Sequence, residues 1–267
     1  MSGVILIYSC EKHRYTRVPK YKLPKSNYNG WPVFYVFATP FLEKEYIFDG
    51  DILTLRCEDS YLHLAKKVFL GYKAVLETFP EAVGVLRCGD DLIFNESALN
   101  RFLDSPKSDY MGFFWGANSR IPMKSKAKRF FWGANVYLPT KLKVQSTFIT
   151  DYYKTHLEDF QNPLHRLPSY QEVMKLTEIP KMQGASGVLT YCSRKSCTLL
   201  IESMQSVGWD VLTYDPTYGY IYIIEDVTTA CILSKHGIYA TEYPMWTENR
   251  TNFDMGNFIA LHTNEYK

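Results

Sequence analysis

The chain has 267 residues, of which 46% are hydrophobic and 22% are charged, and its formal net charge is +2. This is the composition of a globular protein with a large core. The near-neutral balance gives no basic field that would point to nucleic acid as a partner. The N-terminal apolar run is too short for a signal peptide or membrane anchor, so we expect no membrane span and a cytoplasmic location.

Six cysteines are present and none forms a CxxC pair. Most of them lie in apolar runs, which favours reduced core thiols over a disulfide or zinc framework.

Short apolar, β-branched stretches predict buried strands at 3–10 and 31–39, and a turn within 46–56 leads into a third. A helix is predicted over 62–79, where apolar residues recur at steps of three and four. The next predicted strand, 82–88, delivers two adjacent carboxylates, Asp90 and Asp91, at its carboxyl end.

The second half is more irregular. It contains a predicted strand at 185–193, helices at 194–207 and 225–237, and a short strand or turn at 255–264. Alternating strands and helices with apolar strands predict an α/β protein with a mixed, mostly parallel sheet flanked by helices. No Gly/Ser-rich or Pro-rich linker divides the chain, so we expect a single domain over 1–267.

Asp90 and Asp91 sit where open α/β sheets bind their ligands, beyond the carboxyl ends of the strands. Hard divalent cations prefer carboxylate oxygens, so the pair indicates a metal site, with a simple turn as the alternative. A literal D-x-D at 49–51 competes for the metal, but it precedes a strand and reads better as a turn. Gly-Asp-Asp also marks the palm of RNA-dependent polymerases, yet this chain is short for a polymerase and lacks a basic channel.

Four segments together carry a more specific signal. They are "DILTLRCEDSYLHLAKKV" (51–68), "VLRCGDDLIFN" (85–95), "ASGVLTYCSRK" (185–195) and "IEDVTTACILSKHGI" (224–238). In order and rough spacing this set resembles the inverting β-1,3-galactosyltransferase and Fringe-like glycosyltransferases. A late histidine, His262, also falls where that family places one.

The resemblance implies a GT-A fold and a metal-dependent inverting glycosyltransferase. Such an enzyme moves a hexose or N-acetylhexosamine from a UDP-sugar to a hydroxyl of a glycan or glycoprotein acceptor, forming a β-1,3-type linkage. The implied cofactor is Mn²⁺, with Mg²⁺ as a second possibility. The donor-binding part would span about 1–110 and the acceptor-binding and catalytic part about 111–267.

Carried over position by position, the resemblance assigns roles to individual residues. Asp91 and His262 match the metal ligands, and Asp226 matches the base that takes the proton from the acceptor hydroxyl. Glu225 would shape the acceptor site. The residues expected to contact the donor are Ser9, Asp59, Lys67, Asp90, Ser186 and Gly187.

A six-residue segment, FFWGAN, occurs at 113–118 and again at 130–135, with a basic loop between the copies. Its tryptophans, Trp115 and Trp132, are candidates for stacking on an acceptor sugar, with core aromatics as the alternative.

The sequence departs from the family pattern at several points. Gly89 replaces the first residue of the acidic triplet, the Gly-rich run is reduced to Ser186-Gly187-Val188, and His63 stands at the Asn of the helix block. The family's N-terminal motif of paired Arg and Trp is only faintly echoed, by Arg14 and Arg17. A catalytically inactive glycan-binding module derived from a transferase is therefore the alternative function.

Overall fold

The computed structural model describes residues 2–20, 27–114, 143–145, 147–180 and 184–263. Trp115, Trp132, the basic loop 124–129 and most of both FFWGAN copies lie outside the described residues.

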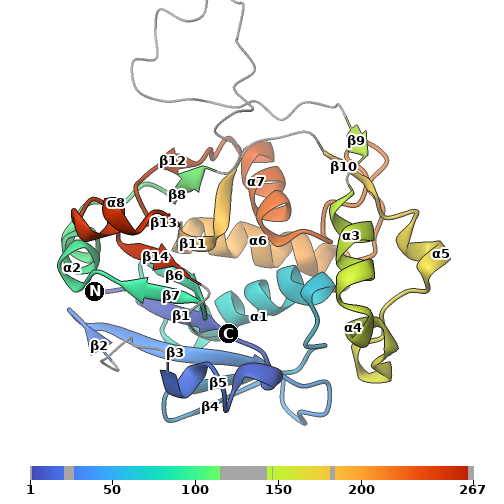
Figure 1. The fold of residues 1–267 in the computed structure, drawn as a ribbon, viewed down its shortest axis with the longest axis horizontal. Helices are drawn as coiled ribbons and strands as arrows, with labels where there is room; N and C mark the ends of the chain where they lie inside the picture. Colours follow the sequence, from blue (N-terminus) through green and yellow to red (C-terminus); the bar gives the residue numbers. More distant parts are fainter. Residues whose placement is uncertain (1, 21–26, 115–142, 146, 181–183, 264–267) are drawn as a thin grey trace, which may run out of the picture.

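A nine-stranded mixed sheet forms the centre of the described chain (Figure 1). Its strands, in spatial order, are β12 (Thr241–Glu242), β8 (Tyr110–Phe114), β11 (Ala185–Ser193), β6 (Gly84–Gly89), β1 (Val4–Tyr8), β3 (Trp31–Ala38), β5 (Ile52–Leu55) and β4 (Tyr46–Asp49), with β2 (Asn27–Tyr28) paired to β3. Strands β6, β1, β3 and β5 run parallel, so their carboxyl ends meet at one edge.

The central strand β1 is buried on both faces, as the apolar run at its position predicts. Because side chains alternate along a strand, Val4, Leu6 and Tyr8 enter one core cluster, while Ile5 and Ile7 enter another on the opposite face. The sheet is therefore covered on both sides.

Three helices pack on the sheet face that carries Val4, Leu6 and Tyr8. They are α1 (Leu64–Thr78), α6 (Arg194–Ser206) and α7 (Glu225–Lys235). The second face is covered by α2 (Glu96–Asp104) and by a small sheet formed from β13 (Trp246–Thr247), β14 (Ala260–His262) and β7 (Leu92–Phe94), next to α8 (Arg250–Asp254). Pairing of β7 with β14 brings His262 beside the segment that follows β6.

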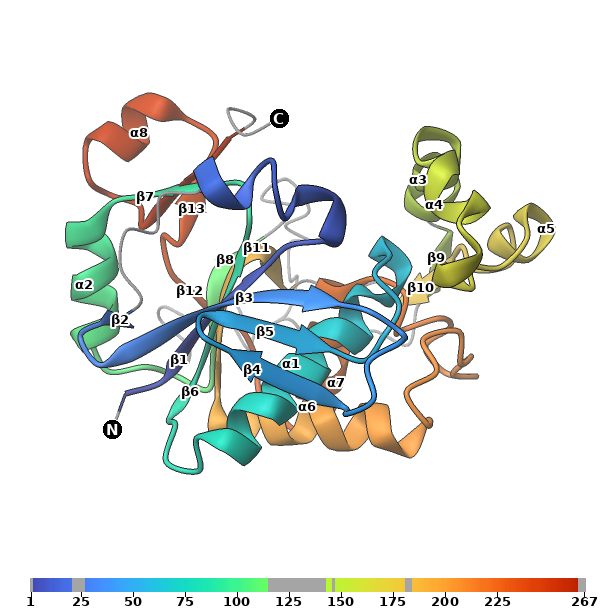
Figure 2. The same cartoon turned by 90° about the horizontal axis from the view of Figure 1, so that it is seen from below.

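Three short helices form an arm set off from the sheet, which Figure 2 shows clearly. This helical arm comprises α3 (Phe148–Thr155), α4 (Leu157–Gln161) and α5 (Tyr170–Val173), and it is flanked by the paired strands β9 (Lys143–Gln145) and β10 (Glu178–Pro180). Ile149 and Val173 of the arm share a buried cluster with Ile224 and Val227 at the start of α7. The arm is thus anchored to one particular helix terminus.

The α/β class, with helices on both sides of a mixed sheet, is confirmed. The sheet is less parallel than expected, because β11 runs antiparallel to both of its neighbours and β4 runs antiparallel to β5. An apolar strand pattern is the same in either direction, so the sequence carries no signal for this reversal.

All six cysteines are free, and five of them are buried, as expected for core thiols. Within the described ranges, every helix is too short or too polar to cross a bilayer.

Strands β6 and β11 approach closely at Gly84, where a Cβ would lie 2.4 Å from the Cys192 carbonyl oxygen and 2.6 Å from Tyr191 Oη. We expect Gly84→Ala to lower the free energy of unfolding by about 1–3 kcal/mol, because a packed interior resists added atoms. Urea denaturation measures this change. Glu81→Ala, at an exposed position three residues earlier, should stay within about 0.5 kcal/mol of the parent. A Gly84→Ala variant as stable as the parent would contradict the close approach.

Candidate active site

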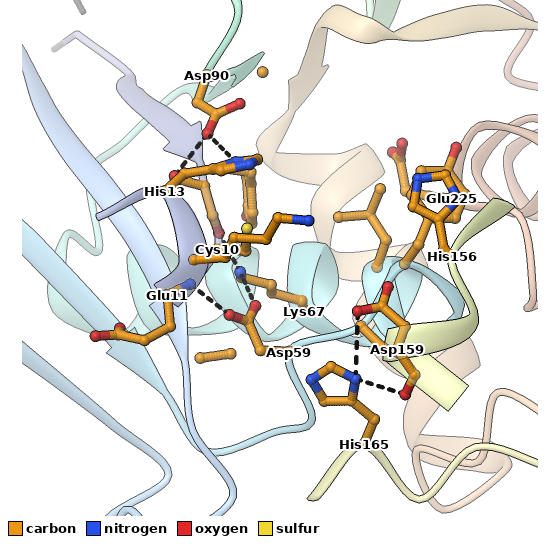
Figure 3. Close-up of a pocket in the computed structure, with 18 of the residues that line it drawn as sticks. Cys10, Glu11, His13, Asp59, Lys67, Asp90, His156, Asp159, His165 and Glu225 are labelled. Carbon is orange, nitrogen blue, oxygen red and sulfur yellow. Dashed lines mark hydrogen bonds and ion pairs between the residues drawn. The ribbon is translucent and has the colours of Figure 1, made fainter. Parts of the chain in front are cut away.

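A cavity of about 1170 Å³ opens beyond the carboxyl ends of β1, β3 and β6. It is lined by every described residue to which the family resemblance assigns a role, namely Ser9, Asp59, Lys67, Asp90, Asp91, Ser186, Gly187, Glu225, Asp226 and His262. Figure 3 shows the N-terminal segment with Asp90 and His13 on one side and the helical arm with Asp159 and His165 on the other. Distant parts of the chain therefore converge here.

The carboxylate of Asp90 is buried and fully engaged. Ser9 Oγ donates to Asp90 Oδ2 at 2.7 Å, and His13 Nδ1 lies 3.1 Å from the same oxygen. Arg17 Nη1 donates to Asp90 Oδ1 at 2.9 Å. A buried carboxylate needs such partners, so Asp90 fixes the loop after β1 against the end of β6.

Asp91 and His262 form a second pair at the cavity wall, with His262 Nε2 3.2 Å from Asp91 Oδ2. Burial raises the pKa of Asp91, but the hydrogen bond and charge of His262 outweigh it and leave that pKa below its usual value. The same hydrogen bond raises the pKa of His262. On the other side of the ring, His262 Nδ1 lies 3.3 Å from Glu248 Oε1, which orients the imidazole.

This pair fits one divalent cation. Two ligand atoms held at right angles about 2.1 Å from one ion are separated by roughly 3.0 Å, close to the observed 3.2 Å. A carboxylate oxygen and an imidazole nitrogen are both ligands that Mn²⁺ accepts. Across the described ranges, no cluster of three or more His, Cys, Asp or Glu side chains forms a metal site, so ligands from outside these side chains would have to complete the coordination.

Lys67 of α1 reaches the same cavity from a buried position. Its Nζ donates to Asp59 Oδ1 at 2.6 Å and also to the backbone carbonyl of Ser9. Asp59 Oδ2 in turn accepts from the Glu11 backbone N–H at 2.8 Å. The ammonium therefore positions the loop after β1 and places a cation at the cavity floor.

A buried ion pair joins β6 to α7: Arg87 Nη2 lies 3.2 Å from Glu225 Oε2. Gly187 makes room for it, since a Cβ there would lie 2.3 Å from Glu225 Oε2 and 3.1 Å from Arg87 Nη1. A register shift between Ala185 and Thr190 of β11 marks the place where Gly187 meets the pair. The reduced Gly-rich run thus retains the glycine that the packing requires.

Asp226 follows Glu225 in the first turn of α7, and its Oδ1 accepts from the Val227 backbone N–H at 2.9 Å. Burial, together with the neighbouring charge of Glu225, raises the pKa of Asp226 to about 7. A carboxyl group that titrates near neutral pH can accept a proton under ordinary conditions.

Several residues at the site escaped the sequence analysis. Arg87 is a charged residue inside a buried strand, a signal that could have found it. Tyr61, Tyr152 and His156 line the cavity from the turn before α1 and from the arm, where short helices give no clear periodicity. The positions of Trp115 and Trp132 lie outside the described residues.

No protein-family model matches this chain, and no curated protein matches it significantly.

We expect Arg87→Met to lower the free energy of unfolding by about 3–5 kcal/mol, because it leaves Glu225 buried without its counter-charge. Urea denaturation provides the measurement. The double variant Arg87→Met/Glu225→Gln should recover much of that loss. Equal destabilisation by the single and double variants would show that lost packing, and not an unpaired charge, dominates.

Proposed function

We propose that this chain is a metal-dependent inverting glycosyltransferase of the GT-A type. It would transfer a hexose or N-acetylhexosamine from a UDP-sugar to a hydroxyl of a glycan acceptor, with a β-1,3-type linkage, in the cytoplasm. One observation carries the proposal: the same cavity is lined by a metal-compatible pair, Asp91 and His262, and by Asp226, a carboxyl group whose pKa is near neutrality.

The donor side of the cavity is built around Asp91, His262 and Lys67. Asp91 and His262 would hold Mn²⁺ or Mg²⁺, and a bound ion there offsets the charge of the departing diphosphate. Gly89 is compatible with this role, because a Cβ at that position would lie only 2.8 Å from Asp91 Oδ1. The absence of an acidic side chain at Gly89 leaves Asp91 room to face the cavity.

On the acceptor side, Asp226 acts as the general base. The acceptor oxygen attacks the anomeric carbon from the face opposite the diphosphate, forming the new C–O bond while its proton moves to Asp226. The bond from the anomeric carbon to the diphosphate oxygen breaks with its electron pair, and UDP leaves. A single displacement inverts the anomeric configuration and requires no covalent enzyme intermediate.

The alternative, a glycan-binding module derived from a transferase, shares the fold and the cavity. It differs in one measurable respect, since it would bind carbohydrate without metal-dependent affinity for UDP.

Asp226→Asn should abolish sugar transfer while leaving UDP affinity within about twofold, because the amide keeps the Val227 contact but cannot take a proton. For the parent protein, kcat should rise with pH below about 7 and level off above it, since the base acts when deprotonated. Both are read from UDP release and product formation between pH 5 and 9. Near-normal turnover by Asp226→Asn would remove this residue from the role.

Isothermal titration of UDP with and without Mn²⁺ tests the donor side. We expect His262→Ala to weaken Mn²⁺-dependent UDP binding on the order of 10–100-fold, whereas the exposed His236→Ala, at the end of α7, should match the parent. UDP affinity that is identical with and without metal in the parent would favour the glycan-binding alternative.

A further inference from the structure

We propose that Tyr61, Tyr152 and His156, here called the aromatic row, form a subsite for the sugar units of a neutral oligosaccharide acceptor. The inference rests on the proposed function, because it assigns the part of the acceptor that does not react. It commits to a neutral oligosaccharide as the occupant.

The three rings follow one another along the cavity wall. The Tyr61 and Tyr152 ring centroids are 5.1 Å apart, and the Tyr152 and His156 rings are stacked with centroids 4.4 Å apart. All three residues line the cavity, and Tyr61 remains 39% exposed within it. The apolar C–H face of a pyranose packs against exposed aromatic faces. Tyr61 and the half-buried His156 offer such surface, while Tyr152 is only 8% exposed and holds the other two rings in place.

The row begins beside the proposed base. Leu62, which follows Tyr61, shares a buried cluster with Ile224 and Val227 on either side of the Glu225–Asp226 pair. Burial and the charges of Asp226 and Glu225 raise the pKa of Tyr61, which agrees with this proximity. An acceptor whose hydroxyl faces Asp226 would therefore extend over Tyr61 and along the arm.

Polar groups accompany the rings. The Tyr152 hydroxyl donates to Asp159 Oδ2, and His165 Nδ1 lies 3.6 Å from Asp159 Oδ1. Rings flanked by hydrogen-bonding groups suit a ligand that presents both C–H faces and hydroxyls, and they suit a purely apolar ligand less well.

The charges of the two cavity walls differ. The arm and the start of α7 carry four cavity-lining carboxylates, those of Glu158, Asp159, Glu225 and Asp226. Arg87 is paired with Glu225 on this wall. The N-terminal wall carries four cations, of which Arg14, Arg17 and Lys67 are paired with Glu11, Asp90 and Asp59, while Lys12 lies 3.8 Å from Glu158 of the arm. Charges balance on the N-terminal wall, where a diphosphate would depend on the divalent cation, while the acidic wall disfavours an anion and admits a neutral ligand.

The size of the cavity agrees with two ligands. Single-ligand pockets usually measure about 300–1,000 Å³, and this cavity measures about 1170 Å³. A nucleotide-sugar on the N-terminal wall therefore leaves the acidic, aromatic wall for the acceptor.

A glycan array that carries neutral and acidic oligosaccharides, together with Ser/Thr-rich peptides, tests the subsite directly. The full chain is applied with UDP and Mn²⁺, and binding is measured without any turnover. We expect the parent to bind neutral glycans, and Tyr61→Ala and His156→Ala each to lose about three- to tenfold in affinity. Tyr170→Ala is the matched control, since it removes a 45% exposed aromatic ring from the same arm outside the cavity lining.

The outcomes separate this inference from the proposed function. Glycan binding that depends on the row, without any UDP-sugar turnover, would uphold the subsite and refute the transferase. Sugar transfer with an unchanged acceptor KM in both row variants would overturn the subsite and keep the transferase. Preferential binding of acidic glycans or of the peptides, or no binding by the parent, would also overturn it. Circular dichroism identifies an unfolded variant, and Tyr61→Leu, which keeps an apolar side chain but removes the ring, then replaces Tyr61→Ala.

Discussion

A buried ion pair, Arg87 with Glu225, is the constraint on which the geometry of the cavity depends. Arg87 lies on the strand that leads into Asp90 and Asp91, and Glu225 opens the helix that carries Asp226. Two buried charges are tolerated together, but either one alone is costly, so the strand and the helix are held in a fixed relation. Gly187 is required at the crossing because any side chain there would meet the pair.

The same ion pair influences the chemistry proposed for the site. Glu225 contributes to raising the pKa of Asp226, and Arg87 acts in the opposite direction, so the pair limits the net effect of that charge. The helical arm, anchored to the residues on either side of Asp226, supplies the aromatic wall. Across the cavity lies the N-terminal wall, whose loop is fixed by Asp90 and Lys67. The cavity thus has one wall on which charges are paired and another that is acidic and aromatic.

How much the sequence could predict differs between its parts. The buried strands β1, β3 and β6 and the helices α1, α6 and α7 are long and strongly patterned, and they lie where expected. The reversal of β11 and the pairing of β7 with β14 depend on contacts between distant residues, which local pattern does not encode. The roles predicted for Asp91, Asp226 and His262 rest on the family resemblance. The aromatic row was missed because its residues lie on a short turn and short helices that tertiary packing, more than periodicity, holds in place.

The most direct measurement is a crystal structure of the protein with UDP and Mn²⁺, with the anomalous signal of manganese used to locate the ion. The account predicts one strong peak within bonding distance of Asp91 and His262, with the diphosphate on the ion and Asp226 facing the anomeric position across the cavity. Manganese and UDP bound elsewhere on the protein, or an empty cavity at saturating concentrations of both, would contradict it.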